Sequence, residues 1–175
     1  WKINESPDSW KVEDGQIICK GPRSHLFYAG EVASHNFKDF EVRLKVMTKP
    51  GANAGFYFHT TFQESGWPRK GYEAQINATQ KDPKKTGSLY GVRNVMNVAA
   101  HKDNEWFDYH IIVKGKKITT KINGEVQIEY TEPEGGPTKK EKGGFERMLS
   151  SGTFAIQCHD PGSEVRIKSI MVKPL

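Results

Sequence analysis

The sequence has few cysteines and lacks long apolar segments. Its 175 residues include two cysteines, Cys19 and Cys158, which lie far apart, and neither belongs to a CxxC pair. Each lies in an apolar, strand-like segment, so we expect two buried free thiols, with a disulfide as the alternative. No apolar run approaches the roughly 20 residues that a membrane-spanning helix needs, which excludes a membrane span.

The motifs of several common enzyme classes are also missing. The sequence contains no HExxH, no P-loop and no GxSxG motif, so nothing supports a zinc protease, a nucleotide-phosphate enzyme or a serine hydrolase. No glutamate is followed two positions later by an aspartate, so the Glu-x-Asp-x-x-Glu pattern common in retaining β-sandwich glucanases is absent as well.

Positive charge is in excess, but it is not concentrated in one segment. The formal net charge is +5, from 26 lysines and arginines against 21 aspartates and glutamates. Basic residues alternate with acidic ones, as in residues 38–45 (Lys-Asp-Phe-Glu-Val-Arg-Leu-Lys). The densest basic run, residues 139–142, lies beside glycine and proline, which predicts a solvated loop. We therefore expect no nucleic-acid partner.

Short segments that alternate between apolar and polar residues dominate the chain. Residues 40–46 alternate without a break, and residues 109–130 read as a series of hairpins that includes an Asn123-Gly124 turn. Glycine and proline punctuate the chain at intervals of about ten residues, which is typical of an all-β sandwich. We predict an all-β fold, a two-sheet antiparallel sandwich of jelly-roll type, formed as one domain by residues 1–175.

Few residues are expected outside strands and turns. No segment sustains a helical stripe, and only residues 145–149 are expected to form one short helical turn. Residues 80–86 and 131–152 read as long loops. A loop of the second length is uncommon in a compact domain unless it covers a site or is mobile.

Three strand-like segments carry polar residues opposite their apolar residues. Because side chains alternate along a strand, the polar positions of residues 53–59, 71–77 and 154–159 are expected to share one face. The members of this polar set are Asn53, Tyr57, His59, Glu73, Gln75, Gln157 and His159. Amides, histidines and a tyrosine ring suit a sugar, with its many hydroxyls and apolar ring face. We predict a carbohydrate ligand on this face; three unrelated polar faces are the alternative.

The same face carries too few carboxylates for ordinary glycoside hydrolysis. That reaction uses two carboxylates, roughly 5 Å apart for retention and up to about 9.5 Å apart for inversion. The predicted face offers one, Glu73, so a second would have to come from a loop.

The order of these motifs resembles that of the bacterial 3-keto-disaccharide hydrolase domain family, which has a concanavalin-like jelly-roll fold. The resemblance covers almost the whole chain. It rests on residues 10–15 (WKVEDG), 40–44 (FEVRL), 50–58 (PGANAGFYF), 71–76 (GYEAQI), 86–91 (TGSLYG) and 105–106 (EW), on Gly115 with Asn123-Gly124, and on residues 155–159 (AIQCH). Each piece is weak by itself, but eight pieces in the same order are specific.

The resemblance implies an enzyme that acts on glycosides already oxidised to a ketone at C3. The ketone acidifies the C2 hydrogen, so a single base can remove it; the C1 leaving group then departs by elimination, and water adds to the enone. This route needs a base and a group that stabilises the enolate, either a metal or hydrogen-bond donors. The catalytic candidates are Glu73, His159 and His59, with Glu73 or His159 as base. The substrate-binding candidates are Asn53, Tyr57, Gln75 and Gln157.

The sequence departs from the family pattern in the closing strand, where residues 168–170 are Lys-Ser-Ile instead of Arg-Asn-Ile, and at two positions of the strands that carry the polar face. The family usually has arginine at the position of His59 and often has aspartate at the position of Asn77. Histidine in place of arginine at position 59 alters an expected substrate contact. The fold implied by the resemblance therefore carries over to this chain more directly than the substrate does. Glu73 with the histidines is also a possible site for a divalent metal ion, although no ligand spacing in the sequence predicts one.

Other functions and the cellular location follow from weaker features. A non-catalytic carbohydrate-binding module shares this fold and is the competing function, because it needs aromatic platforms and hydrogen bonds but no tuned base. A structural interaction domain would have no convergent polar pocket. The chain starts at Trp1 without a methionine, which fits a removed signal peptide, so we expect a secreted or periplasmic protein.

Overall fold

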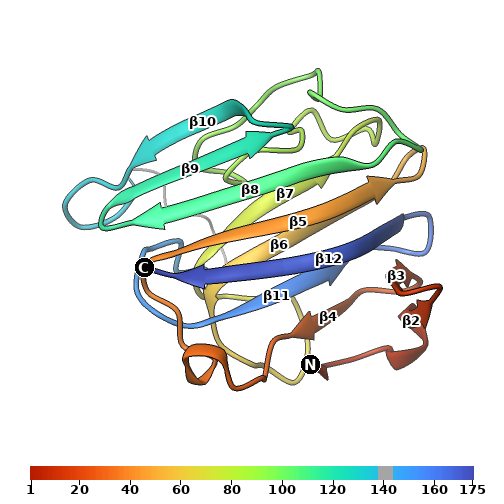
Figure 1. Ribbon diagram of the computed structural model, residues 1–175, viewed down its shortest axis with the longest axis horizontal. Coiled ribbons are helices and arrows are strands. Elements are labelled where there is room, and N and C mark those ends of the chain that lie inside the picture. Colours follow the sequence, from red (N-terminus) through yellow and green to blue (C-terminus); the bar gives the residue numbers. More distant parts are fainter. Residues whose placement is uncertain (138–143) are drawn as a thin grey trace.

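Two antiparallel β-sheets pack face to face in the computed structural model, which describes residues 1–137 and 144–175 (Figure 1). The five-stranded sheet has the order β1 (Lys2–Ile3), β4 (Ser24–Phe27), β11 (Thr153–Cys158), β6 (Asn53–Thr60) and β7 (Tyr72–Asn77). The seven-stranded sheet has the order β10 (Glu125–Thr131), β9 (Lys117–Ile122), β8 (Phe107–Lys114), β5 (Phe40–Thr48), β12 (Glu164–Pro174), β3 (Gln16–Lys20) and β2 (Trp10–Glu13). Two short 3-10 turns, η1 (Pro7–Ser9) and η2 (Val32–His35), complete the described elements. The predicted all-β sandwich is confirmed.

The apolar half of the strand alternation forms the core between the two sheets. Phe56 on β6 and Phe154 on β11 are at most 2% exposed. The ring of Phe154 stacks on Phe37 at a centroid distance of 4.3 Å and meets Phe40 edge-on at 4.9 Å. Because neighbouring side chains point to opposite faces, burying these positions turns the odd-numbered residues of β6, β7 and β11 away from the core.

The hairpins expected between residues 109 and 130 are present. Strands β8, β9 and β10 pair in sequence, and the β9–β10 turn places Asn123 and Gly124 at φ values of 50° and 89°. Two consecutive positive φ angles are what a tight two-residue hairpin requires, and asparagine and glycine adopt them at low cost. The sequence signal and the local geometry therefore agree.

The helical turn expected at residues 145–149 is not formed, and that prediction is wrong. The backbone of Glu146 is used instead by a bridge to the segment that ends at β7. Its N–H donates to the carbonyl of Arg69 at 2.7 Å, and its carbonyl accepts from the N–H of Gly71 at 2.9 Å. These bonds hold the segment extended and place it over the five-stranded sheet. The basic run at residues 139–142 lies outside the described residues.

Both cysteines are buried and free, as expected. Cys19 lies on β3 of one sheet and Cys158 on β11 of the other, so the two thiols are part of the packing between the sheets. The Sγ of Cys19 lies 3.8 Å from the carbonyl oxygen of Gln157.

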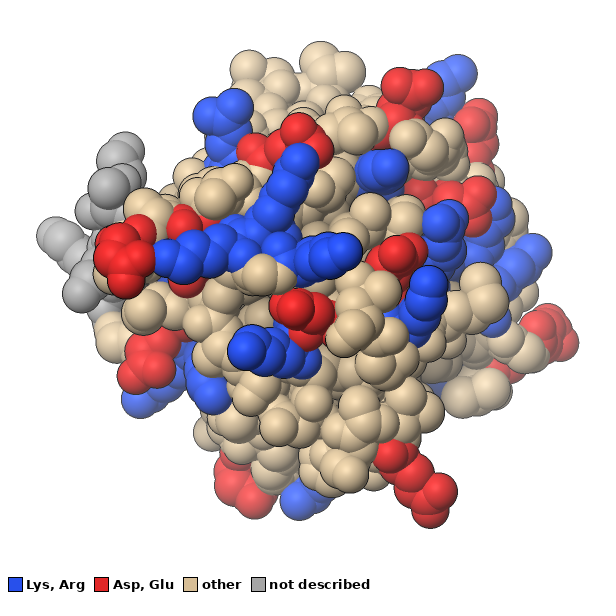
Figure 2. All heavy atoms as spheres, turned by 60° about the vertical axis from the view of Figure 1, so that its left-hand side comes forward, with Lys and Arg blue, Asp and Glu red and all other residues tan. Residues whose placement is uncertain are grey.

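The surface charge is mixed, as the sequence indicated. On the face shown in Figure 2, lysine and arginine side chains are interspersed with aspartates and glutamates. This arrangement gives no support to a nucleic-acid interface. Within the described ranges, no helix combines the length and apolar character needed to cross a bilayer.

Replacing Phe154 with alanine tests the packing of the core. The change removes a buried ring that touches three other phenylalanines, so we expect the free energy of unfolding to fall by about 3–5 kcal/mol. Val12→Ala is the control, because Val12 is 77% exposed, and we expect it to change stability by less than about 0.5 kcal/mol. Urea denaturation followed by circular dichroism measures both. A small loss for Phe154→Ala would show that the core repacks around the cavity.

Candidate functional site

A pocket of about 310 Å³ lies on the outward face of the five-stranded sheet. Strands β6, β7 and β11 supply its floor, and four loops supply its walls and rim. The lining residues are Asn53, Tyr57, Trp67, Glu73, Gln75, Tyr90, Phe145, Arg147, Gln157 and His159. Six of the seven residues predicted from strand alternation therefore lie in one pocket.

The side chain of Glu73 is the centre of the hydrogen bonding in this pocket. Its Oε2 accepts a hydrogen bond from the hydroxyl of Tyr57 at 2.7 Å, and its Oε1 accepts from Nε2 of Gln157 at 3.0 Å. The same Nε2 also donates to the Tyr57 hydroxyl at 3.0 Å. Tyr57 on β6 and Gln157 on β11 thus hold the carboxylate in one position.

Gly55 makes room for this carboxylate. In the strand register, Gly55 lies opposite Gln75 on one side and Gln157 on the other. A Cβ atom at Gly55 would approach the Oε1 of Glu73 to 2.4 Å, which is well inside van der Waals contact. The glycine is therefore required by the close approach of the Glu73 carboxylate over the sheet.

Burial changes the acidity of Glu73. The residue is 6% exposed, and desolvation raises the pKa of its carboxyl above the ordinary 4.5. The hydrogen bond from Tyr57, the charge of Arg147 and the hydrogen bond from Gln157 act in the opposite direction but do not cancel the effect of burial. The site therefore holds a carboxyl group that keeps its proton to higher pH than an exposed glutamate does.

His159 lies at the rim of the same pocket, next to an aspartate. Its Nδ1–H donates to Oδ2 of Asp160 at 2.6 Å, and its ring packs on Trp67 at a centroid distance of 5.1 Å. Partial burial raises the pKa of Asp160, but the hydrogen bonds from His159 and from the N–H of Gly162 outweigh it, so this pKa is lower than usual. An ionised Asp160 fixes the tautomer in which Nε2 of His159 is the proton acceptor.

His59 is not part of the pocket, contrary to the prediction. The pairing of β6 with β11 shifts register next to it, and its backbone has a φ of 57°, which breaks the alternation on which the prediction relied. The Nε2–H of His59 donates to the carbonyl of Lys38 at 2.8 Å, and its Nδ1 accepts from the N–H of Ser150 at 3.1 Å. Burial lowers its pKa. We therefore interpret His59 as a neutral side chain that joins two loops.

Arg147 and Phe145 were missed because they come from a long loop without strand alternation. Arg147 is 6% exposed and donates to the carbonyls of Pro68 and Gly71, each at 3.2 Å. Its guanidinium also lies 4.7 Å from the ring centroid of Phe145. The only available signal was the length of the loop, which suggested that it covers a site. The structure places its described end over the pocket.

Two acceptor oxygens in the pocket have no partner among the described residues. They are Oδ1 of Asn53 and Oε1 of Gln157, and both are buried. A buried carbonyl oxygen without a donor is unfavourable, so a ligand with hydroxyl donors would be stabilised there. A sugar has such donors.

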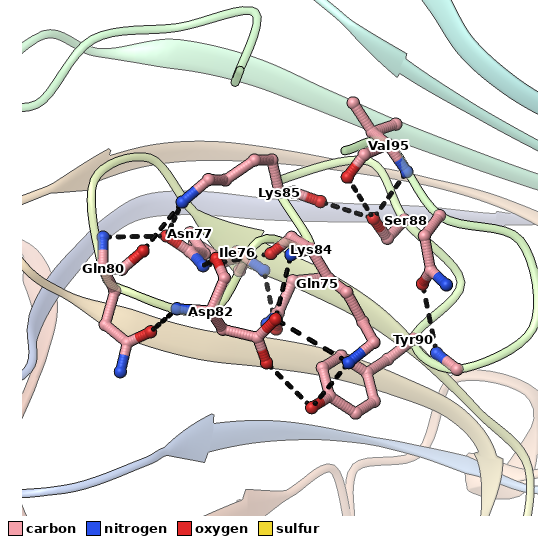
Figure 3. A network of polar contacts seen from close by, with 12 residues as sticks. Gln75, Ile76, Asn77, Gln80, Asp82, Lys84, Lys85, Ser88, Tyr90 and Val95 are labelled. Atoms are coloured by element: carbon pink, nitrogen blue, oxygen red, sulfur yellow. Dashed lines mark hydrogen bonds and ion pairs between the residues drawn. The ribbon is translucent and has the colours of Figure 1, made fainter. Parts of the chain in front are cut away.

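Tyr90 is held at the pocket by the loop that follows β7. Its hydroxyl donates to Oδ2 of Asp82 at 2.8 Å (Figure 3). Its N–H donates to the carbonyl of Glu73 at 2.9 Å. Asn77 stabilises the same loop, because its Nδ2 donates to the carbonyls of Asp82 and Lys84, each at 3.0 Å. Asn77 therefore has a structural role at the base of this wall.

The residues proposed for a metal do not form a metal site. With His59 bonded elsewhere, Glu73 and His159 lack a third ligand, and no group of three histidine, cysteine, aspartate or glutamate side chains with suitable positions occurs in residues 1–137 and 144–175. No step below is therefore assigned to a metal.

Solved structures of other proteins share this sandwich. A Parabacteroides distasonis protein provisionally described as a glycosyl hydrolase superposes with a TM-score of 0.77 at 20% identity, over 95% of this chain and 83% of that one. The carbohydrate-binding module CBM66 from Bacillus subtilis gives 0.63 at 10% identity, over 94% and 90%. The exoplasmic domain of VIP36, bound to calcium and mannose, gives 0.64 at 10% identity, over 95% and 81%. At these identities the likeness concerns the fold alone.

The two packed antiparallel sheets define a jelly-roll protein with a polar pocket on the outward face of the five-stranded sheet. The family model for the 3-keto-alpha-glucoside-1,2-lyase-like domain matches residues 1–173, so the chain belongs to this family of 3-keto-disaccharide hydrolase domains. The resemblance inferred from the sequence is confirmed. A search among curated proteins finds no significant match.

The raised pKa of Glu73 predicts a specific pH dependence of stability. Between the ordinary value of 4.5 and the higher value in the folded protein, the folded state keeps a proton that the unfolded chain has released. This stabilisation is complete below the unfolded pKa and is lost as the pH rises through the folded pKa. Glutamine stays neutral, so the Tm of Glu73→Gln relative to the wild type should increase over this interval.

Thermal melts of both proteins from about pH 4 to about pH 8 measure this difference. Glu129→Gln is the matched control, because Glu129 is an exposed glutamate on β10 of the other sheet. Curves for Glu73→Gln that run parallel to the wild type would show that burial does not alter the titration of Glu73.

Proposed function

We propose that this protein is a carbohydrate-active enzyme that cleaves 3-keto-glycosides by elimination across C1 and C2 followed by hydration. One observation carries the proposal: a carboxyl with a raised pKa, Glu73, and a histidine held by an aspartate, His159, line one pocket. Glu73 is also the only carboxylate among the described residues that line it. One carboxyl group and one histidine fit a mechanism with a histidine base and a carboxylic acid. They do not provide the carboxylate pair that an ordinary glycosidase uses.

His159 is the base in this proposal. Asp160 accepts the Nδ1 proton, so Nε2 can take the C2 hydrogen of the substrate. As the C2–H bond breaks, its electron pair forms a double bond between C2 and C3, and negative charge develops on the C3 oxygen. Asp160 acts through the histidine, by fixing its tautomer and by stabilising the imidazolium.

Arg147 is the group that we assign to the developing enolate. Its guanidinium lines the pocket and is buried, and a buried positive charge is effective because water screens it little. The carbonyls of Pro68 and Gly71 fix its orientation before the substrate binds. The guanidinium is therefore already oriented in the folded protein, so no free energy is needed to reorient it during the reaction.

Glu73 is the acid that protonates the departing C1 oxygen. Its raised pKa increases the neutral fraction, and the hydrogen bonds from Tyr57 and Gln157 hold the group in place. When the C1–O bond breaks, the enolate electrons form the C1–C2 double bond of an enone, and the leaving group takes the proton. Water then adds at C1, so the complete reaction is a hydrolysis.

The remaining pocket residues bind the sugar in this proposal. The unpartnered oxygens of Asn53 and Gln157 accept hydroxyl hydrogen bonds, and Trp67 offers a ring face for stacking. Gln75 and Tyr57 complete the polar floor. We propose a secreted or periplasmic location as part of the same function, which fractionation of the source cells would test.

The decisive test compares a 3-keto-glycoside with the same glycoside unoxidised. Elimination requires the ketone, so the enzyme should cleave the first and leave the second intact. In deuterated water the product should carry deuterium at C2, because the proton removed from that carbon exchanges with solvent. Direct displacement at C1 would leave C2 unlabelled. Product NMR distinguishes the two routes.

Variants assign the roles in the same assay. His159→Ala should lower kcat by roughly 10²–10⁴-fold with little change in binding, and Glu73→Gln should lower it for leaving groups that need protonation. Asp160→Asn should lower kcat and shift the pH profile. His59→Gln is the control, expected to keep activity if it folds. Unchanged turnover in His159→Ala and Glu73→Gln would overturn both assignments.

Two further outcomes bear on the alternatives. Binding of sugars without turnover of any keto-glycoside would favour the non-catalytic carbohydrate-binding module. Turnover that a chelator abolishes and a divalent ion restores would assign the enolate to a metal rather than to Arg147.

A further inference from the structure

A second groove of about 550 Å³ lies on the same sheet, at the opposite ends of β6 and β11 from Asn53 and Gln157. Thr60 lines it, three residues beyond Tyr57 on β6, which corresponds to roughly 10 Å along a strand. Thr153, its register partner on β11, lines it as well. The proposed chemistry uses none of its lining residues.

One loop contributes an aromatic ring to each of the two cavities. Residues 61–70 place Trp67 in the pocket around Glu73 and Phe62 in the second groove. The ring of Phe62 stands edge-on against Phe27 at 5.3 Å. Nε2 of Gln63 donates to two carbonyls within the loop, at 2.7 and 2.9 Å, so the loop is internally braced. The second groove therefore has a preformed aromatic wall.

The hydrogen-bonding groups of the groove also favour a ligand. The Oγ1 of Thr60 has no partner among the described residues, although the residue is 1% exposed. Short hydroxyls and an amide from residues 34, 36, 61, 151 and 153 line the same space. Aromatic rings next to short hydroxyl and amide groups suit a sugar, for the same physical reasons as in the first pocket.

The charge of the groove differs from that of the first pocket. Lys2 and Lys70 line it together with His35, and no aspartate or glutamate occurs among its described lining residues. Neither lysine forms an ion pair with a described residue; Lys2 lies 3.7 Å from the ring centroid of Phe62, and Lys70 donates to the carbonyl of Ser151 at 3.3 Å. Two ammonium groups without carboxylate partners in the part of the chain that the structure describes favour an anion.

We propose that this groove is a second carbohydrate-binding site, which takes a sugar unit that carries a negative charge, either a carboxylate or a sulfate. Phe62, which packs on the buried ring of Phe27, contacts the ring of that unit, and Lys2 and Lys70 contact its anionic group. The site is independent of the elimination chemistry, and it favours glycans with acidic units over neutral ones.

Calorimetric titration at low salt with three probes tests the proposal: digalacturonate, which carries carboxylates only, neocarrabiose sulfate, which carries a sulfate and no carboxylate, and neutral cellobiose. At least one anionic disaccharide should bind more tightly than cellobiose, and salt should weaken it. The two anionic probes distinguish a carboxylate from a sulfate. Equal affinity for all three, or no binding of either anionic probe, would overturn the proposal.

Variants locate the binding. Lys70→Gln should raise the Kd of the anionic disaccharide about tenfold, the loss expected for one charge-assisted hydrogen bond, and Thr60→Val should raise it without changing the charge. Lys114→Gln removes the same charge from β8 of the other sheet and should leave the Kd unchanged. Equal effects of Lys70→Gln and Lys114→Gln would show general charge attraction and contradict the site.

A final comparison separates this site from the first pocket. Glu73→Gln should leave the Kd of the anionic disaccharide unchanged, whatever its effect on keto-glycoside turnover. If Glu73→Gln abolished binding of the anionic disaccharide, the ligand would lie in the first pocket and the second site would be wrong. If turnover were absent while the groove variants behaved as stated, the enzymatic function would fail and the second site would stand.

Discussion

The position of the Glu73 carboxylate over the sheet is the constraint on which the rest of the site depends. Gly55 leaves space for its oxygen, and Tyr57 and Gln157 hold it by hydrogen bonds. Each of these residues lies on a strand buried on its other face, so the apolar core determines where they stand. A buried carboxyl that accepts a hydrogen bond at each oxygen can keep a raised pKa without disrupting the fold, because its donors partly offset its desolvation.

The walls of the pocket follow a different principle. Trp67, Tyr90 and Arg147 come from loops, and hydrogen bonds from their own segments to the sheet or to each other keep them in place. The strands thus position the Glu73 carboxyl, and braced loops supply the aromatic rings and the guanidinium. This division is common in binding sites, because loops vary without disturbing the core. It also explains how one sheet carries two cavities of different charge, one on each side of residues 61–70.

Six of the seven residues predicted from strand alternation line the pocket, because period two is a local property of the chain. The alternation failed at His59, where a register shift and a positive φ turn the side chain toward Lys38 and Ser150. Such a shift depends on how β6 pairs with β11, which lies about a hundred residues further along the chain. The sequence around His59 therefore gives no signal of how β6 pairs with β11. The helical turn expected at residues 145–149 failed for the same reason, since its backbone partners are Arg69 and Gly71.

The sequence by itself determined the all-β class, the hairpins, the buried thiols and the polar face, because alternation, turn residues and composition act over a few neighbouring positions. Motif order was enough to indicate the family. Only the tertiary structure decided that Asp160 fixes His159, that Arg147 lies next to Glu73, and that Lys2 and Lys70 share a groove. These relations join residues far apart in sequence or rest on the orientation of a side chain, and both depend on how the two sheets and their loops pack.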